Sequence, residues 1–417
     1  MLLVTPPNSY RIAAYLEAAG ALRVEPLVAS PGRHSLIGAL ASGVHVDLND
    51  PEAVGRLIGA TRDNPVAGVV ATDDAAVELA SKVASSLGLP HNPPGAARLS
   101  RRKDLARARL HDAGVAVPAH RRIDLDRPLP PQLQGLDYPV VVKPVSLSAS
   151  RGVIRADDAH ECLNACSRIE RLLSREGQLP EQERRWLLVE RFIDGPEVAV
   201  EALLHNGDLD VLAVFDKPDP MRGPCFEETY YITPSRHPPD VLSLLVSTVA
   251  RACRACGLRE GPVHAELRVA EGRAWVMEVA SRTIGGECAR LLRFGTGQEL
   301  ETLVLQRALG RPVEVQAMEG AAGVLMLPIP GAGILRRVEG VLAAQRVPCI
   351  EELILSVREG YELVPLPEGG SYLGFLFARA STPRQVETAL REAHSRLNIV
   401  IAPLFRLDRP GSPMDQS

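Results

Sequence analysis

The chain has 417 residues and a mass of 45.0 kDa, with 46% hydrophobic and 24% charged residues. This length predicts two or three globular domains with sizeable cores. The 47 lysines and arginines and the 51 aspartates and glutamates give a net charge of −4 and a pI near 6.2. Because the chain also has no lysine–arginine tract, nucleic acid is excluded as its main partner.

The N-terminus and the cysteines favour a soluble cytoplasmic protein without a membrane partner. The chain turns polar after three or four apolar positions, unlike a signal peptide, and no run approaches the ~18 apolar residues of a membrane span. Seven cysteines, an odd number, favour reduced thiols. The pairs Cys162/Cys166 and Cys253/Cys256 lack a second ligand pair at metal spacing, so we interpret them as packing residues.

The N-terminal residues 1–95 alternate between strand and helix patterns. Strands are expected at Leu2–Val4 and near Glu25–Ala29, with a helix at about Ser9–Ala19 and a further strand and helix within residues 66–90. Alternation of this kind predicts parallel β–α–β units. We therefore expect a small Rossmann-like domain.

The loop after the first strand holds Asn8, Ser9 and Arg11. Open α/β sheets place ligands at such loops, but this loop lacks the G-x-G-x-x-G fingerprint of dinucleotide binding. Turn and helix-cap roles are the favoured alternative for these three residues.

A second domain is expected over residues 96–310. It begins with one basic helix that ends at Gly114. Residues 174–185 are charged and are expected to form a solvated connection. The D-G and N-G turns within residues 186–215 predict antiparallel hairpins.

A third, C-terminal lobe of α+β type is expected over residues 311–407. The composition shifts toward glycine and proline there, and the lobe ends in a strand, YLGFLFARA, and an amphipathic helix at Pro383–Leu397. Residues 408–417 are expected to be a disordered tail.

Lys143 ends an apolar strand just before a small-residue loop, Ser146–Gly152. The backbone N–H groups of such a loop can surround phosphate oxygens while a lysine supplies positive charge. The G-x-x-x-x-G-K-[ST] pattern is absent, so this is not a P-loop. A surface lysine with a buried stem is the alternative.

Two glutamates lie on neighbouring strand patterns separated by the turn AEGR. A hairpin register could bring Glu266 and Glu278 to one face, where they would bind Mg²⁺ together with substrate phosphates. A pair of solvated glutamates is the alternative. It suits Glu278 poorly, because a carboxylate within the apolar run VMEVA needs a partner or a cation.

The order of these segments resembles the ATP-grasp superfamily. Lys103, YPVVVKP, the Ser/Gly loop, LVERFIDGPEVAVE, HAELR and MEVASR follow one another at its approximate spacing. The resemblance covers roughly residues 1–400 and implies an ATP-grasp fold, mixed α/β and α+β, with an N-terminal Rossmann-like domain. FDKPDPMRGPCFEETYYITPSR and SRTIGGE resemble carboxylate–amine ligases related to bacterial L-amino acid ligases, which join two amino acids through an acyl phosphate.

The resemblance implies a binding site for ATP with Mg²⁺, for which Mn²⁺ is the alternative metal. The positions that match phosphate-binding residues are Lys103, Lys143 and, in the loop, Ser146, Ser148, Ser150 and Gly152. The positions that match adenine- and ribose-binding residues are Glu190, Phe192, Ile193 and Glu197.

The metal and catalytic positions follow in the same way. Glu266 and Glu278 match the metal ligands, and Arg282 matches the arginine that neutralises the γ-phosphate or the acyl phosphate. Together with Lys143, Glu278 and Arg282 form the implied catalytic set. The usual E-x-N-x-R pattern has Ala280 in place of asparagine here, so water or Ser281 would complete the metal sphere. Amino acid ligases share this change.

The substrate positions are implied more loosely. Glu228 and Tyr231 lie where these ligases place groups that meet an ammonium, although Glu228 could also be a simple acidic loop residue. Gly285 and Gly286 would leave room beside the reacting carboxylate.

Three further residues are weaker candidates. His264 could orient the nucleophile or the acyl phosphate, or it could support a metal ligand. Asp216 and Lys217 are either substrate contacts or a simple ion pair.

The function expected from the resemblance is an ADP-forming ligase that joins a carboxylate, here an amino acid, to an amine. A bicarbonate-using carboxylase or carbamoyl-phosphate-type enzyme is one alternative. A nucleotide-binding protein without turnover is another, but it would lack the carboxylates at Glu266 and Glu278. Small molecules are the expected partners, and a homodimer is the commonest assembly.

Overall fold

The computed structural model describes residues 1–7, 9–32, 42–177 and 179–404. Asn8 and the tail expected at residues 408–417 lie outside these residues. Within them, no helix is long and apolar enough to cross a membrane.

The N-terminal segment forms a parallel sheet in the order β3-β2-β1-β4. The strands are β1 (Leu2–Val4), β2 (Leu27–Ser30), β3 (Ser42–His45) and β4 (Val69–Ala71). The helices are α1 (Ile12–Ala21), α3 (Ala53–Asp63), the short 3-10 helix η1 (Asp74–Ala76) and α4 (Val77–Ser86). Because β1 lies between β2 and β4, the loops that follow β1 and β4 lie side by side at the carboxyl edge of the sheet, where such sheets bind ligands.

Helices α5 (Pro94–Arg101) and α6 (Lys103–Asp112) replace the single basic helix expected from the sequence. The break is at Arg102, whose backbone is extended with φ −101° and ψ 98°. The Lys103 N–H then donates to the carbonyl of Val145 at 2.9 Å. This contact ties the start of α6 to the end of the Lys143 strand.

A small antiparallel sheet in the order β5-β8-β6-β7 follows. Its strands are β5 (His120–Asp124), β6 (Val140–Pro144), β7 (Ile154–Ala156) and β8 (Trp186–Arg191), and the accompanying helices are α7 (Leu129–Gln132), α8 (Ala159–Leu173) and α9 (Glu181–Arg184). Apolar side chains of α8, including the free thiols Cys162 and Cys166, are buried against this sheet.

The connection at residues 174–185 is less solvated than expected. It contains α9, and Glu183 on this helix is buried and paired with Arg101. The charge pattern suggested a solvated face, but an arginine from α5 compensates the buried glutamate.

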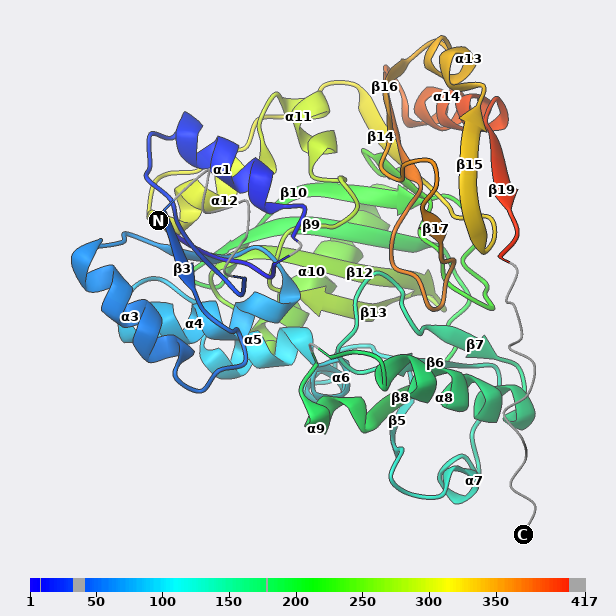
Figure 1. Ribbon diagram of the computed structural model, residues 1–417, viewed down its shortest axis with the longest axis horizontal. Helices are drawn as coiled ribbons and strands as arrows, with labels where there is room; N and C mark the ends of the chain where they lie inside the picture. The colour runs from blue at the N-terminus through cyan, green and yellow to red at the C-terminus, as the bar shows by residue number, and fades with distance from the viewer. Residues whose placement is uncertain (8, 33–41, 178, 405–417) are drawn as a thin grey trace, which may run out of the picture.

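An eight-stranded antiparallel sheet in the order β13-β12-β9-β10-β11-β14-β18-β16 runs through the middle of the molecule (Figure 1). Its strands are β9 (Glu197–His205), β10 (Asp208–Lys217), β11 (Tyr230–Thr233), β12 (Gly261–Ala270), β13 (Arg273–Ala280), β14 (Ala321–Leu327), β16 (Ile350–Leu355) and β18 (Gly374–Ala380). Pairing of β11 with β14 continues this sheet across residue 310, where the sequence predicts a domain boundary.

Helices cover this large sheet, and a smaller sheet adjoins it. The helices of this part are α10 (Pro239–Cys256), α11 (Arg290–Thr296), α12 (Leu300–Ala308), α13 (Val341–Gln345) and α14 (Pro383–Ser395). Helix α10 buries Leu245, Val249 and the free thiol Cys253 against β9, β12 and β13. The smaller sheet consists of β17 (Glu362–Leu363), β15 (Gly333–Glu339) and β19 (Asn398–Ala402), in that order.

Candidate functional site

A cavity of about 1250 Å³ is lined by residues of the N-terminal domain, the small sheet, the large sheet and the C-terminal lobe. Most of the residues singled out in the sequence lie on its wall. They are Lys103, Lys143, Ser146, Ser148, Ser150, Glu190, Phe192, Ile193, Glu197, Glu228, Tyr231, His264, Glu266, Glu278, Arg282, Gly285 and Gly286. Gly152, Asp216 and Lys217 do not line it.

Glu266 and Glu278 are direct cross-strand partners in the β12–β13 hairpin. Paired residues of an antiparallel ladder project from the same face, so both carboxylates point to the cavity side. The register shifts by one residue immediately after Glu266, between it and Leu267. The hairpin therefore has the register that the AEGR turn suggested.

Glu278 lies between two cationic side chains. Its Oε2 is 3.0 Å from Lys103 Nζ, and its Oε1 is 4.0 Å from Arg282 Nη2. Lys103 Nζ also donates to the carbonyl of Leu147 at 3.0 Å, which places this lysine under the Ser146–Gly152 loop. The positive charges of Lys103 and Arg282, on either side of Glu278, are suited to neutralise phosphate oxygens.

Arg282 is held from the other side by the N-terminal domain. Its Nε donates to Asp74 Oδ2 at 3.0 Å, and its Nη1 donates to the carbonyl of Thr283 at 3.1 Å. Burial alone would raise the pKa of Asp74, but Arg282, Lys103 and Arg11 outweigh it and lower that pKa. Asp74 therefore stays ionised and fixes the guanidinium.

Lys143 belongs to a buried ion cluster with Glu190 and Arg107. Both cations contact the Glu190 carboxylate, and Arg107 also donates to the carbonyl of Val276 at 2.6 Å. Burial alone would raise the pKa of Glu190, yet Arg107 and Lys143 lower it to about 2. The carboxylate of Glu190, which the resemblance places near adenine, thus contacts Lys143, which the resemblance places near the phosphates.

The Glu190 cluster predicts a specific acid sensitivity. Because folding lowers the pKa of Glu190 from 4.5 to about 2, its stabilisation is present above pH 4.5 and is lost as the pH falls toward 2. The contribution is of order 3 kcal/mol. In urea unfolding, the stability gap between the wild type and Glu190→Gln should shrink as the pH falls below about 4.5.

The exposed Glu17 on α1 provides the control for this measurement. Glu17→Gln should follow the wild-type pH profile throughout. A constant gap between wild type and Glu190→Gln from pH 7 to pH 3 would mean that the carboxylate charge contributes nothing in this range.

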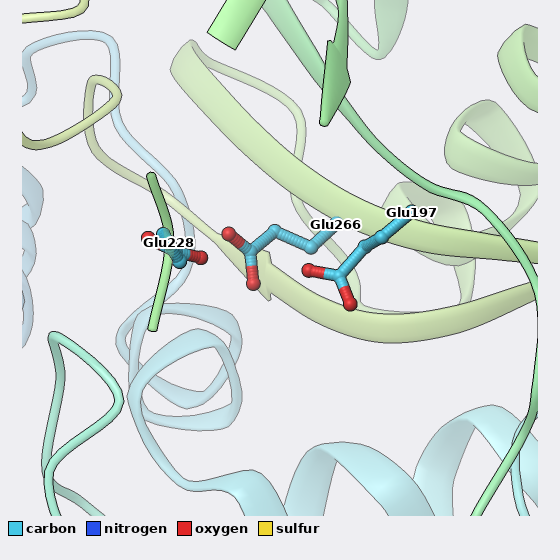
Figure 2. Close-up of side chains that lie close together, drawn as sticks. All are labelled: Glu197, Glu228 and Glu266. Carbon is cyan, nitrogen blue, oxygen red and sulfur yellow. The ribbon is translucent and has the colours of Figure 1, made fainter. Parts of the chain in front are cut away.

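Glu197, Glu228 and Glu266 form a second charged group, which we call the glutamate cluster (Figure 2). One oxygen from each lies within 4.8 Å of the others. Figure 2 shows Glu197 and Glu266 extending from the large sheet, with Glu228 facing them from a separate segment. Oxygen donors at this spacing can hold a cation.

Lys217 supplies that cation from within the chain. Its Nζ lies 2.8 Å from Glu197 Oε1, 2.6 Å from Glu228 Oε1 and 2.8 Å from Glu266 Oε1. Burial would lower the pKa of Lys217, but the glutamate cluster raises it well above its usual value. Lys217 therefore remains charged, and it does not form an ion pair with the neighbouring Asp216, which accepts instead from Ser235 and Arg236.

The cluster also changes what Glu197 and Glu228 can do. The second oxygen of Glu197 accepts from Arg268 Nε at 2.8 Å, so both oxygens of the residue expected near ribose have protein partners. Burial, and then the charge of Glu266, raise the pKa of Glu228 to about 7 although Lys217 opposes them. Tyr231 closes this side, with its ring centroid 4.9 Å from Lys217 Nζ.

His264 connects the cluster to a buried carboxylate. Its Nδ1 lies 3.2 Å from Glu201 Oε2, and its Nε2 lies 3.5 Å from Glu266 Oε1. Burial would lower the pKa of His264, but these two carboxylates raise it to about 9. The imidazolium thus supports Glu266, which is the second of the two roles considered for His264.

The Ser146–Gly152 loop is fastened by the C-terminal lobe. Gly152 N–H donates to the carbonyl of Pro367 at 2.9 Å, and Arg151 Nε donates to the carbonyl of Glu368 at 3.2 Å. Gly152 has φ +69°, and a Cβ there would be 3.1 Å from the Pro144 ring. A larger residue would therefore push the loop away from the Lys143 strand.

Phe192 and Ile193 form the apolar side of the cavity. The guanidinium of Arg155 lies 4.4 Å from the Phe192 ring centroid. The Phe192 N–H donates to the carbonyl of Pro139 at 2.9 Å, and the Ile193 carbonyl accepts from Arg268 at 2.7 Å. These two backbone groups have partners within the protein, and the Phe192 ring and the Ile193 side chain offer an apolar contact surface.

The segment after Arg282 contacts the N-terminal domain. Gly286 N–H donates to the Tyr10 hydroxyl at 2.9 Å. A Cβ at Gly286, where φ is +63°, would lie 2.1 Å from Met326 Sδ, so no side chain fits there without displacing the methionine. The Ser281 hydroxyl is hydrogen-bonded to that of Ser100 at 2.7 Å, and Ser281 does not line the cavity. Both observations argue against Ser281 as a metal ligand.

Four contributors escaped the sequence analysis or were ranked low in it. Arg107 lies within a helix full of arginines, Glu201 within an apolar strand, and Asp74 in the pair Asp73–Asp74 after β4. Lys217 had a signal, a lysine at the end of a strand in FDKPD, but nothing local showed its three partners. Glu201 offered the clearest signal, because a carboxylate in EVAVEALL needs a compensating group.

Two family models match the chain. Residues 136–290 match the ATP-grasp domain, and residues 325–402 match the L-amino acid ligase C-terminal domain 2. Among solved structures, an L-amino acid ligase from Bacillus licheniformis superposes with a TM-score of 0.84 at 27% identity, over 96% of this chain and 98% of that one.

Two curated relatives match a smaller share of this chain. A D-alanine–D-alanine ligase from Gloeobacter violaceus is 32% identical over 254 residues, which cover 55% of this chain and 75% of the relative. Human carnosine synthase 1 is 27% identical over 281 residues, which cover 62% of this chain but only 33% of that protein.

Proposed function

The chain belongs to the ATP-grasp superfamily as a C–N bond-forming ligase, and we propose that it activates an amino acid carboxylate as an acyl phosphate and joins it to the amine of a second amino acid. The fold and the kinship with L-amino acid ligases expected from the sequence are confirmed. Similarity to the Bacillus licheniformis enzyme along nearly the whole chain supports the choice of substrates.

One observation carries the proposal. Glu278 has Lys103 on one side and Arg282 on the other, and Glu266 faces it directly across the hairpin. This arrangement brings carboxylates for a metal, a lysine for phosphates and an arginine for a reacting anion to one wall of the cavity.

The residues fit a divalent metal. Glu266 and Glu278 offer carboxylate oxygens on one face of the sheet. Mg²⁺ commonly binds one or two such carboxylates together with phosphate oxygens of the substrate. Bound there, Mg²⁺ supplies charge stabilisation to the phosphate oxygens of ATP. Lys217 already neutralises the glutamate cluster, so we assign the metal to the Glu278 side of Glu266.

In the first step, a substrate carboxylate oxygen attacks the γ-phosphorus of ATP, the bond to the bridging oxygen breaks, and ADP leaves. Lys103 and Lys143 hold the phosphate oxygens under the Ser146–Gly152 loop. Arg282, fixed by Asp74, takes up the negative charge that gathers on the transferred phosphoryl group and on the acyl phosphate.

In the second step, the amine nitrogen attacks the acyl carbon and phosphate leaves with one former carboxylate oxygen. The amine arrives as an ammonium and loses two protons as the amide forms, one to the released phosphate and one to solvent. We assign Glu228 and Tyr231 to the wall that receives a substrate ammonium. The loop held by Pro367 and Glu368 keeps water away from the acyl phosphate, which would otherwise hydrolyse.

A panel experiment tests this function. Phosphate release from Mg-ATP is measured with amino acids singly and in pairs, and the nucleotide product is identified. We expect ADP, phosphate and amide formation with a subset of pairs. Formation of AMP and pyrophosphate would contradict the acyl phosphate, and turnover that requires bicarbonate instead of an amino acid would assign the chain to the carboxylase alternative.

A further inference from the structure

Arg11 brings a positive charge from the N-terminal domain to the cavity wall. It directly precedes α1, and its side chain is only 11% exposed. Its Nη1 lies 2.5 Å from Asp73 Oδ1, and its guanidinium lies 4.7 Å from the ring centroid of Tyr10. These contacts hold the guanidinium against the cavity.

The contact with Asp73 leaves one edge of this guanidinium unused. Nε is buried and has no hydrogen-bond partner among the described residues. Nη2 lies 3.0 Å from the position that a Cβ would take at Gly285, so a side chain at Gly285 would crowd this nitrogen. Nε and Nη2 form the side-on edge of the arginine fork, whose two parallel N–H groups match a carboxylate.

Arg11 and Arg282 line the same cavity. Asp73, which pairs with Arg11, directly precedes Asp74, which pairs with Arg282. Consecutive Cα atoms are about 3.8 Å apart, so the two arginines are anchored one residue apart. In an α-amino acid the carboxylate carbon is two bonds from the nitrogen, so a carboxylate bound at Arg11 would keep the amine in the cavity that Arg282 also lines.

We propose that the Nε–Nη2 edge of Arg11 binds the free carboxylate of the amine-donor substrate while the amine of that substrate faces the acyl phosphate beside Arg282. The inference rests on the proposed function and adds a requirement to it. The nucleophile must be an α-amino acid, since a plain amine or an amino acid amide has no carboxylate for Arg11.

The test compares an amino acid with its own amide as amine donors, at a saturating concentration of one acid substrate. The wild type should prefer the free acid. In Arg11→Gln, kcat/KM for the free acid should fall about 10- to 100-fold, the effect of one charge-assisted contact, while kcat/KM for the amide stays unchanged. Arg11→Lys keeps the charge but not the planar fork of the guanidinium, so its kcat/KM for the free acid should lie between those of the wild type and Arg11→Gln.

If Arg11 had a purely structural role, Arg11→Gln would lower kcat/KM equally for the free acid and the amide, and that result would overturn the inference. Arg56→Gln provides the matched control, because Arg56 lies on α3 of the same domain with a side chain 55% exposed. Its preference for the free acid should equal that of the wild type.

Hydroxylamine separates this inference from the proposed function, since it converts an acyl phosphate to a hydroxamate without needing a carboxylate. Wild type and Arg11→Gln should both form hydroxamate. If neither forms it, the proposed function fails. If both form it and the acid-to-amide preference is the same in both, only the assignment of Arg11 fails.

Discussion

Replacing Glu278 by glutamine is expected to lower kcat by about 10³-fold while the protein stays folded. The amide keeps the shape of the side chain and can still accept from Lys103, but it loses the negative charge that a metal and two cations require. Because the side chain is 20% exposed and lies at the cavity wall, we expect a change in the free energy of unfolding of no more than about 1 kcal/mol. Steady-state phosphate release and thermal unfolding measure the two effects.

Glu271→Gln is the matched control for this variant. Glu271 lies in the turn of the same hairpin, and its side chain is 62% exposed and contacts Arg191 on the surface. Its activity should equal that of the wild type. If Glu278→Gln also turned over at the wild-type rate, Glu278 would have no part in metal binding or phosphoryl transfer.

Replacing Lys217 by methionine is expected to give the largest loss of stability. Methionine fills a similar volume but leaves Glu197, Glu228 and Glu266 without the ammonium that lies within 2.8 Å of all three. Breaking a buried ion pair by removing one partner costs about 3–5 kcal/mol. Thermal unfolding should therefore begin at a clearly lower temperature.

The same variant should also gain a response to divalent cations. Three carboxylate oxygens within 4.8 Å of one another form a donor set for Ca²⁺ or Mg²⁺ once Lys217 is gone. Added Ca²⁺ should raise the melting temperature of Lys217→Met more than that of the wild type. If Lys217→Met melted at the wild-type temperature without added cations, the ammonium would not be what holds the glutamate cluster together.

Two further variants keep this prediction testable if Lys217→Met is too unstable to purify. Lys217→Arg retains a cation and should lose much less stability. Lys82→Met removes a half-exposed lysine that pairs with Glu78 one helical turn away, and it should change the free energy of unfolding by less than about 1 kcal/mol.

The hairpin with Glu266 and Glu278 could be predicted because its determinants are local. Two strand patterns and the intervening AEGR turn fix which residues face each other, and the apolar neighbours of Glu278 indicate a compensated charge. The parallel N-terminal sheet was predictable for a related reason, since strands and helices alternate at short intervals.

The ion pairs that support the site could not be read in the same way. Arg107 and Glu190 are 83 residues apart, and Asp74 and Arg282 are 208 residues apart. Each side chain looks like an ordinary surface charge within its own segment, and only the packing of separate sheets brings the partners together. The extended backbone at Arg102 likewise depends on a distant acceptor, the carbonyl of Val145, whereas the local pattern favours one continuous helix.

Transfer of ¹⁸O from a labelled amino acid carboxylate tests the central claim most directly. If the carboxylate attacks the γ-phosphorus, each phosphate released during amide formation carries one oxygen from the amino acid, and the nucleotide product is unlabelled ADP. Mass spectrometry of the phosphate should therefore show one ¹⁸O per product formed. Amide formation with unlabelled phosphate, or with the label in AMP, would contradict activation through an acyl phosphate.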